Sequence, residues 1–212
     1  MDRGGPVLDN FWNRIIYKIW SPMYDKFFNS GAFLNGRKEV FEEIPFQKGQ
    51  KILFVGVGTG ADLELINHAN FEITAVDYST EMLNQARTKF VDSSIQFLEM
   101  DAQHMEFESE SFDYIVASLI LSVVPDADKC FREMTRVLKS EGDIIIFDKF
   151  VPKNKKLSLP KSILRPIIRI LGTDIGLSFE ELFIRNSENI YIKEDKPVML
   201  KGMYRKIVIH KN

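Results

Sequence analysis

Three alternating glycines, Gly56, Gly58 and Gly60, directly follow the apolar run 51–55. Glycine permits positive φ angles and lets a ligand approach the backbone closely. A helix that begins after the last glycine would point its free N–H groups at the same place, which suits a nucleotide-like cofactor. The stretch therefore predicts a strand, a tight turn and a helix that form a cofactor site. Tight turns also use glycine for steric reasons alone, so the glycines do not decide the matter.

Two aspartates follow the next two predicted strands. Asp77 lies 17 residues beyond Gly60, where a carboxylate can accept hydrogen bonds from both hydroxyls of a ribose. Asp101 ends the following strand, where it could accept a hydrogen bond from an adenine amino group. Each acid alone is more often a turn residue. Because ligands of open α/β sheets bind outside the carboxyl ends of the strands, the three features together predict one crevice that holds a nucleoside.

Strands and helices alternate through the centre of the chain, and these elements must position the glycines and the acids. The strands are expected at 51–55, 71–76, 95–100, 112–117 and 143–147, and the helices at 62–68, 80–90 and 127–138. This alternation predicts an α/β fold with a doubly wound, mostly parallel sheet. Two more strands, 189–193 and 203–210, have no helix between them and should close one edge as an antiparallel pair. Ser79 and Ser178 have the residue type and position of helix N-caps.

The whole chain, residues 1–212, is expected to form one domain with four parts. The parts are N-terminal lid helices (1–46), a cofactor-binding core (47–148), a basic amphipathic insertion (149–188) and the strand pair (189–212). The first part has an apolar stripe at helical spacing over 7–20, then a break flanked by Gly31 and Gly36 and a helical stretch at 37–44. Residues 149–169 contain seven lysines and arginines and no acid. A basic, amphipathic segment of this kind favours peripheral association with an anionic lipid surface, whereas a lid and a solvated face are the ordinary alternatives.

The composition limits the remaining classes of function. The 212-residue chain has 45% hydrophobic residues and a net charge of −2, which gives no reason to expect a nucleic-acid partner. The single cysteine, Cys130, is interpreted as structural, and no cysteine and histidine cluster has the spacing of a metal site. No apolar run reaches the roughly 18 residues of a membrane span, and no signal-peptide layout is found. We expect a cytoplasmic protein, peripheral at most on the inner face of the membrane.

From about residue 51 to residue 147 the sequence resembles the class I methyltransferases that use S-adenosylmethionine. The matching segments are 55–60 for the glycine loop, 76–79 with Met82, 100–102, 112–116 leading into Ser118, and 136–139 before Gly142. The resemblance implies an enzyme with a Rossmann-like sheet of seven strands. The cofactor-binding residues that it implies are Gly56, Gly58, Thr59, Gly60, Asp77, Tyr78, Met82, Asp101, Ala102 and Ser118. The glycine loop would line the methionine and ribose portions, Asp77 would hold the ribose, and the later residues would surround the adenine and close the pocket.

One residue departs from the pattern of this family. The family usually has an acid two residues before the first glycine, and this chain has Phe54 there. The substitution removes a carboxylate that would help to order the methionine end of the cofactor. Affinity for the cofactor is then weaker, or another group substitutes for the missing acid.

The flanking segments resemble soluble, membrane-associating bacterial phosphatidylethanolamine N-methyltransferases. They are residues 20–25, 36–37 and 121–126, together with the basic stretch after Phe147. This resemblance implies transfer to an amine of a phospholipid headgroup, with a small-molecule acceptor as the alternative. An amine acceptor needs little beyond loss of its proton, whereas an oxygen acceptor needs a base, for which Tyr24, His104 and Asp148 are the candidates. Tyr24 could also orient cofactor or substrate from a lid.

Two other classes of function fit part of the sequence. The glycine loop with Ala61 also matches the relaxed fingerprint of a dinucleotide site, and Asp77 lies at a suitable distance for an NAD ribose. A dehydrogenase has less reason to possess Asp101 and the predicted C-terminal hairpin, so the methyltransferase is favoured. A catalytically weak, methyltransferase-like binding module is the other alternative, and only Phe54 motivates it. The methyl acceptor, the number of methyl groups transferred and the oligomeric state do not follow from the sequence.

Overall fold

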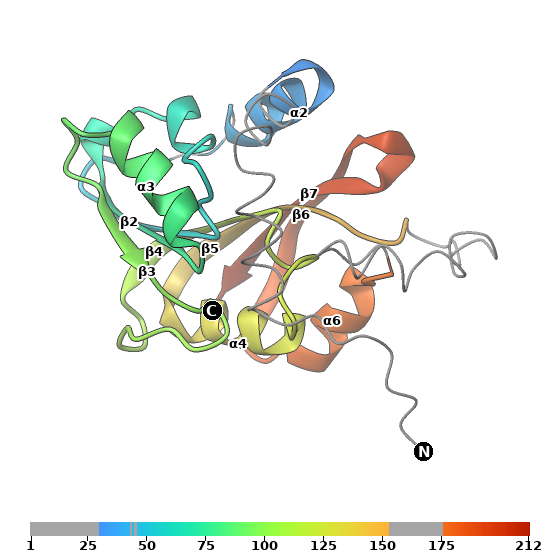
Figure 1. The fold of residues 1–212 in the computed structure, drawn as a ribbon. Coiled ribbons are helices and arrows are strands. Elements are labelled where there is room, and N and C mark those ends of the chain that lie inside the picture. Colours follow the sequence, from blue (N-terminus) through green and yellow to red (C-terminus); the bar gives the residue numbers. More distant parts are fainter. Residues whose placement is uncertain (1–29, 43, 45, 153–175) are drawn as a thin grey trace.

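The computed structural model describes residues 30–42, 44, 46–152 and 176–212 (Figure 1). Within them, one seven-stranded sheet has the order β3-β2-β1-β4-β5-β7-β6. The strands are β1 (Lys51–Val55), β2 (Glu72–Asp77), β3 (Gln96–Glu99), β4 (Phe112–Ser118), β5 (Leu138–Lys149), β6 (Ile190–Met199) and β7 (Tyr204–Lys211). Strands β1 to β5 are parallel to one another, and β7 is antiparallel to both β5 and β6. The predicted mostly parallel sheet with an antiparallel C-terminal hairpin is confirmed.

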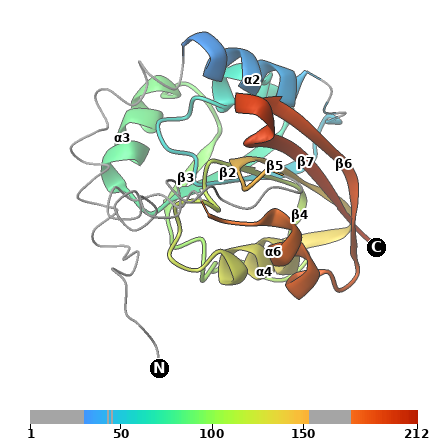
Figure 2. The same ribbon diagram turned by 90° about the vertical axis from the view of Figure 1, so that its right-hand side faces the viewer.

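Helices cover both faces of this sheet. The helices α2 (Gly31–Phe41) and α3 (Thr80–Lys89) lie on one face, and α4 (Ala127–Val137) and α6 (Phe179–Asn186) lie on the other (Figures 1 and 2). Side chains of β1 alternate between two cores: Ile52 and Phe54 pack with α2 and α3, and Leu53 and Val55 with α4 and α6. Because successive side chains of a strand point to opposite faces, a strand buried on both sides must be apolar throughout.

Polar residues at the helix starts satisfy backbone N–H groups that have no partner within the helix. The Ser79 hydroxyl accepts a hydrogen bond from the Met82 N–H at the start of α3, and the Ser178 hydroxyl accepts one from the Glu181 N–H at the start of α6. Both caps are those predicted from the sequence. Asp126 caps α4 in the same way through the Lys129 N–H.

The helix predicted at residues 62–68 is wrong. Two short 3-10 turns, Leu63–Leu65 and His68–Asn70, take its place, and Ile66 between them is extended. Asp62, which could have capped a helix, makes no capping hydrogen bond and instead forms an ion pair with Arg37 of α2. No α-helix therefore begins directly after the glycine turn in the part of the chain that the structure describes.

The predicted break flanked by Gly31 and Gly36 is also wrong, because α2 spans both residues. A Cβ atom at Gly36 would lie 3.0 Å from Val198 Cγ1, so the glycine lets the helix pack closely on the β6–β7 hairpin. Two strands are longer than expected because pairing with β7 extends them. Strand β5 pairs with β7 as far as Lys149, and β6 continues through Pro197, which an edge strand tolerates.

Parts of the sequence-based expectations lie outside the described residues. They include the amphipathic stripe at 7–20, Tyr24 and the basic residues from 153 to 169. Among the described residues, none of the helices has the length and apolar character needed to cross a membrane.

Candidate active site

The loops after β1, β2 and β3 are joined by backbone hydrogen bonds at the carboxyl edge of the sheet. The N–H groups of Gly56 and Val57 donate to the Val76 carbonyl oxygen over 2.9 and 3.0 Å, and the Met100 N–H donates to the Asp77 carbonyl oxygen over 3.0 Å. The glycine turn, Asp77 and the start of the loop that carries Asp101 thus meet at one edge, as the sequence predicted.

The three glycines of the turn have positive φ angles of 71°, 56° and 83° at Gly56, Gly58 and Gly60, but they face different surroundings. A Cβ atom at Gly56 would lie 2.7 Å from Ile120, and one at Gly60 would lie 2.7 Å from Phe90. A Cβ atom at Gly58 would meet nothing within 4 Å. The outer two glycines allow close packing, which was the steric alternative, whereas Gly58 faces open space.

Asp77 is held at the end of β2 by backbone N–H groups. The Gly58 N–H donates to Asp77 Oδ2 and the Ser79 N–H donates to Asp77 Oδ1, each over 2.8 Å. Burial raises the pKa of Asp77, and these hydrogen bonds partly oppose that shift. Among the residues that the structure describes, no lysine or arginine pairs with this carboxylate. The acid is oriented but has no side-chain counter-ion within the described ranges.

The loop after β3 and the segment after β2 carry the other residues predicted for the adenine. Asp101 Oδ1 accepts hydrogen bonds of 2.9 Å from both the backbone N–H and the side-chain amide of Gln103. Ala102 is buried, and Met82 is buried in the first turn of α3. Tyr78 is 39% exposed, so its ring is accessible at the end of β2.

Ser118 ends β4 with an unsatisfied polar group. Its hydroxyl oxygen is buried and has no hydrogen-bond partner in the described part of the chain. The next residue, Leu119, has a φ of 56° and donates its N–H to the Phe147 carbonyl oxygen. A buried hydroxyl without a partner is costly, so its position at the carboxyl edge points to a polar ligand atom.

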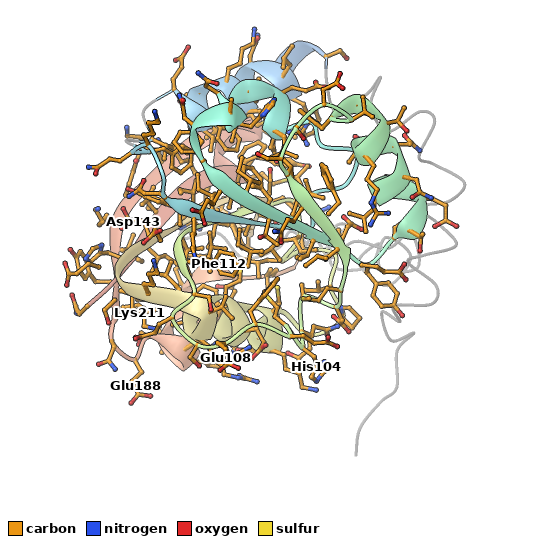
Figure 3. The ribbon with its side chains drawn as sticks, turned by 90° about the vertical axis from the view of Figure 1, so that its left-hand side faces the viewer. His104, Glu108, Phe112, Asp143, Glu188 and Lys211 are labelled. Atoms are coloured by element: carbon orange, nitrogen blue, oxygen red, sulfur yellow. The ribbon has the colours of Figure 1, made fainter. Side chains whose placement is uncertain are left out.

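The three candidates for a base have different positions. His104 is exposed and lies at the lower right of the view in Figure 3, although its backbone N–H is bound to the Asp101 carbonyl oxygen. Asp148 is fully buried and accepts hydrogen bonds from the N–H groups of Ser122 and Lys149. Burial raises the pKa of Asp148, and its contacts orient the loop after β4. Tyr24 lies outside the described residues.

Comparisons with known proteins agree with this geometry. A family model described as a methyltransferase domain matches residues 53–146. The chain is 29% identical over 192 residues to the phosphatidylethanolamine N-methyltransferase of Cereibacter sphaeroides, with 89% of this chain and 92% of that protein covered. It is 31% identical over 144 residues to the demethylmenaquinone methyltransferase of Staphylococcus aureus strain MRSA252, with 65% of this chain and 60% of that protein covered.

Solved structures share the fold. The methyltransferase bound to the Trm112 activator of Haloferax volcanii superposes with a TM-score of 0.76 at 15% identity, covering 93% of this chain and 96% of that one. An S-adenosylmethionine-dependent methyltransferase of Thermotoga maritima superposes with a TM-score of 0.69 at 20% identity, covering 93% and 99% of the two chains. The family model and the relatives support an S-adenosylmethionine-dependent methyltransferase, and the solved structures share its class I fold. The dinucleotide alternative is thereby set aside.

The residues of this methyltransferase fit its methyl donor. Gly58 leaves open space beside the backbone, and among the described residues Asp77 has no counter-ion and the Ser118 hydroxyl has no hydrogen-bond partner. All three lie at the carboxyl edge of the parallel strands, where ligands of such sheets bind.

Phe54 belongs to the hydrophobic core of the methyltransferase. Its side chain is 1% exposed and packs in the cluster that contains Val40 of α2 and Leu83 of α3. The position where the family usually has an acid therefore contributes apolar burial and no carboxylate to the site.

Sequence reasoning missed two polar contacts near the site. Arg37 and Asp62 form a buried ion pair, with 3.1 Å between Nε and Oδ1, which joins α2 to the end of the glycine turn. Gln103 is 7% exposed and contacts Asp101. The sequence signals were slight, since Asp62 follows the turn directly and Gln103 follows Asp101 by two residues. Cys130 is buried in the core, and this burial raises the pKa of its thiol, which agrees with a structural role.

Proposed function

We propose that this methyltransferase methylates the amino group of a phospholipid headgroup of the phosphatidylethanolamine kind. The observation that carries the proposal is the similarity to the phosphatidylethanolamine N-methyltransferase of Cereibacter sphaeroides, which extends over 89% of this chain and 92% of that protein. The match to the demethylmenaquinone methyltransferase covers only 65% and 60% of the two chains. An acceptor like that of the first relative is therefore favoured.

The proposal assigns the cofactor site to the carboxyl edge. Asp77 would accept hydrogen bonds from the ribose, and Asp101 with Ala102 would recognise the edge of the adenine, with Tyr78 and Met82 nearby. The turn of Gly56, Gly58, Thr59 and Gly60 would line the methionine and ribose portions, and Ser118 would close the pocket. When bound, S-adenosylmethionine supplies a methyl group that is already activated on a sulfonium. The protein then has to align an acceptor with this group and exclude water.

The candidate bases support an amine acceptor over an oxygen acceptor. His104 is exposed, and the Asp148 carboxylate is fully buried between two backbone N–H groups. A neutral amine is nucleophilic once it has lost its proton, whereas a hydroxyl acceptor needs a base in contact with it. His104 is the remaining described candidate if the acceptor proves to be oxygen.

The tip of the β6–β7 hairpin supports peripheral contact with a lipid surface. Leu200 is 60% exposed beside Lys201, and both residues have positive φ angles. The tip lies beside α2 in both ribbon views, and Tyr204 pairs with Lys149 at the carboxyl end of β5 (Figures 1 and 2). An exposed apolar residue with an adjacent cation suits the boundary between headgroups and acyl chains. A protein at the inner face of the membrane would agree with this arrangement.

Methyl transfer to defined acceptors tests the proposal. The protein is incubated with a labelled methyl donor and separately with phosphatidylethanolamine vesicles, demethylmenaquinone or an aqueous metabolite extract. Label in the phosphatidylethanolamine is the expected result. Label confined to the aqueous extract would replace the lipid acceptor with a small molecule, and label in demethylmenaquinone would favour the second relative. Binding of S-adenosylhomocysteine without transfer to any acceptor would favour the binding-module alternative.

A further inference from the structure

We propose that Gln103 is a positioning residue that orients the Asp101 carboxylate toward the amino group of the cofactor's adenine and so sets the nucleobase preference of the enzyme. This inference rests on the proposed role of Asp101 at the adenine. Gln103 does not itself contact the reacting atoms in this proposal.

Gln103 joins two elements that are separate in sequence. Its amide nitrogen lies 2.9 Å from Asp101 Oδ1 and 3.2 Å from Asp101 Oδ2, so it spans both carboxylate oxygens. Its amide oxygen accepts a hydrogen bond of 2.9 Å from the backbone N–H of Asp126, the N-cap of α4. The residue is 7% exposed, so these contacts form away from bulk water. The orientation of Asp101 is thereby tied to the start of α4.

The two ends of the Gln103 side chain have complementary partners. The Asp101 carboxylate needs a donor, and the Asp126 N–H needs an acceptor, so only one orientation of the amide satisfies both. Glutamate at this position would keep the acceptor for Asp126 but oppose the Asp101 carboxylate with a second negative charge. Alanine would remove both contacts. A carboxylate oxygen can accept more than one hydrogen bond, so binding Gln103 is compatible with accepting an adenine amino group.

A second set of contacts anchors the same loop independently of Gln103. The Met105 N–H donates to Glu133 Oε2 over 2.7 Å, and Arg136 donates to the carbonyl oxygens of Met105 and Phe107 over 2.8 and 2.7 Å. These contacts lie on α4, with Arg136 and Glu133 paired at 2.8 Å. Loss of the Gln103 side chain should therefore leave the loop in place and remove only the amide from the carboxylate, which keeps its hydrogen bond from the Gln103 backbone N–H. Because the loop has this separate anchor, a positioning role of Gln103 can be distinguished from a general role in the structure of the loop.

The consequence concerns the edge of the nucleobase that carries the adenine amino group, where hypoxanthine has a carbonyl oxygen and a proton on N1. The amino group of adenine donates to an oriented carboxylate, whereas a carbonyl oxygen at that place would face it as a second acceptor. The affinity for S-adenosylhomocysteine relative to that for S-inosylhomocysteine, which has this oxygen, therefore measures how well the Asp101 carboxylate is oriented toward the amino group. The ratio of the two affinities is a readout that general loosening of the protein would not change.

The experiment measures both affinities by calorimetry for the wild type and for Gln103→Ala, Gln103→Glu, Asp101→Asn and Arg136→Met. The wild type should prefer the adenine ligand by at least about tenfold, the worth of one hydrogen bond to a charged group. Both Gln103 variants should reduce this preference by about fivefold or more, as should Asp101→Asn. Arg136→Met, the control for loop anchoring, should lower the melting temperature and leave the preference unchanged.

The possible results distinguish the role of Gln103 from the assignment of Asp101 to the adenine. A preference that Asp101→Asn abolishes and both Gln103 variants retain would overturn the role of Gln103 alone. No preference in the wild type, with no effect of Asp101→Asn, would overturn the adenine assignment and the inference together. If Gln103→Ala fails to fold, Gln103→Glu retains the hydrogen bond to Asp126 and still decides the question.

Discussion

The two edges of the central sheet place aspartates in opposite electrostatic settings. At the carboxyl edge, Asp77 and Asp148 are bound by backbone N–H groups, and burial raises the pKa of each. At the amino edge, Asp113 accepts hydrogen bonds from Lys139 Nζ over 2.7 Å and from the Lys51 N–H over 2.8 Å. These contacts hold the pKa of Asp113 below its ordinary value although partial burial opposes them.

Asp143 extends the pattern at the amino edge, which lies on the left in Figure 3. Its carboxylate lies 3.0 Å from Lys193 Nζ and 2.7 Å from His210 Nδ1. Asp113 and Asp143 at the amino edge each have a lysine partner, whereas Asp77 at the carboxyl edge belongs to the acids that no side-chain cation in the described part of the chain balances. Such acids reduce stability when they are ionised, and they can be satisfied by the donors of a ligand. We therefore expect the amino edge to stabilise the fold and the carboxyl edge to bind the cofactor.

Replacing Asp77 should produce the largest difference between the two edges. Asp77→Asn removes the ionised acceptor proposed for the ribose, and we expect a loss of about 100-fold in affinity for S-adenosylhomocysteine, because two hydrogen bonds to a charged group are affected. Asp113→Asn, the matched change at the amino edge, should leave that affinity within about twofold. Calorimetric titration of both variants makes the comparison. Equal losses would show that the edges do not differ in function.

Glycine substitutions sharpen the same comparison. Gly142→Ala at the amino edge would place a Cβ atom 2.8 Å from the Asp113 carbonyl oxygen, so it should lower stability by about 1–3 kcal/mol without a direct effect on binding. Gly58→Ala meets no neighbour but has a left-handed backbone, so its cost in stability should be about 1 kcal/mol. Its methyl group would enter the proposed cofactor space, and affinity should fall by more than about tenfold. Thermal unfolding and calorimetry separate the two effects. A Gly142 variant with the larger loss of affinity would contradict the assignment of the edges.

The pH dependence of stability should have opposite signs for the two acids. The pKa of Asp77 is raised in the folded protein, so protonation favours folding, and the wild type should gain stability over Asp77→Asn as the pH falls from the folded pKa toward 3.8. The pKa of Asp113 is lowered, so its contribution is present above pH 3.8 and is lost as the pH falls through the folded value. Urea denaturation of the wild type and both asparagine variants across the acidic range measures these slopes. If the pH dependence of stability had the same sign for Asp77 and Asp113, the proposed difference between the two edges would be contradicted.

The smallest expected effect concerns Lys139. Its ion pair with Asp113 joins side chains that are 38% and 28% exposed, so solvent screens much of the interaction. Lys139→Met should lower the free energy of unfolding at neutral pH by about 0.5 kcal/mol and leave the affinity for S-adenosylhomocysteine unchanged. Denaturant unfolding with a parallel binding measurement tests this expectation. A loss of binding would show that the amino edge contributes to the site.

Much of the fold follows from local patterns that the sequence displays. Apolar runs separated by turn residues predict the parallel strands, and Ser79 and Ser178 begin their helices as expected. The missing helix after the glycine turn could not be predicted in this way, because the Asp62 carboxylate pairs with Arg37, 25 residues earlier in the chain. The role of Gly36 could not be predicted either, because the side chain that packs against it, Val198 of β6, lies far away in the sequence.

The candidate site shows the same limit. Asp77 and Asp101 could be placed because each directly follows a strand of a parallel sheet, and the carboxyl ends of such strands share one edge. Gln103 could not, because its role depends on a carboxylate two residues away and on the start of α4, 23 residues away. Ser118 was placed by resemblance, but its unsatisfied hydroxyl becomes visible only when its surroundings are known.

The position of β7 has a consequence for synthesis of the protein. The strand follows β6 in sequence but lies between β5 and β6, so the parallel strands are made before the partner that covers β5. Until β7 arrives, Ile144, Ile145 and Ile146 form an apolar, unpaired strand edge, which is a template for association with other chains. A nascent chain that stalls before β7 should therefore aggregate through β5 and need a chaperone while translation continues.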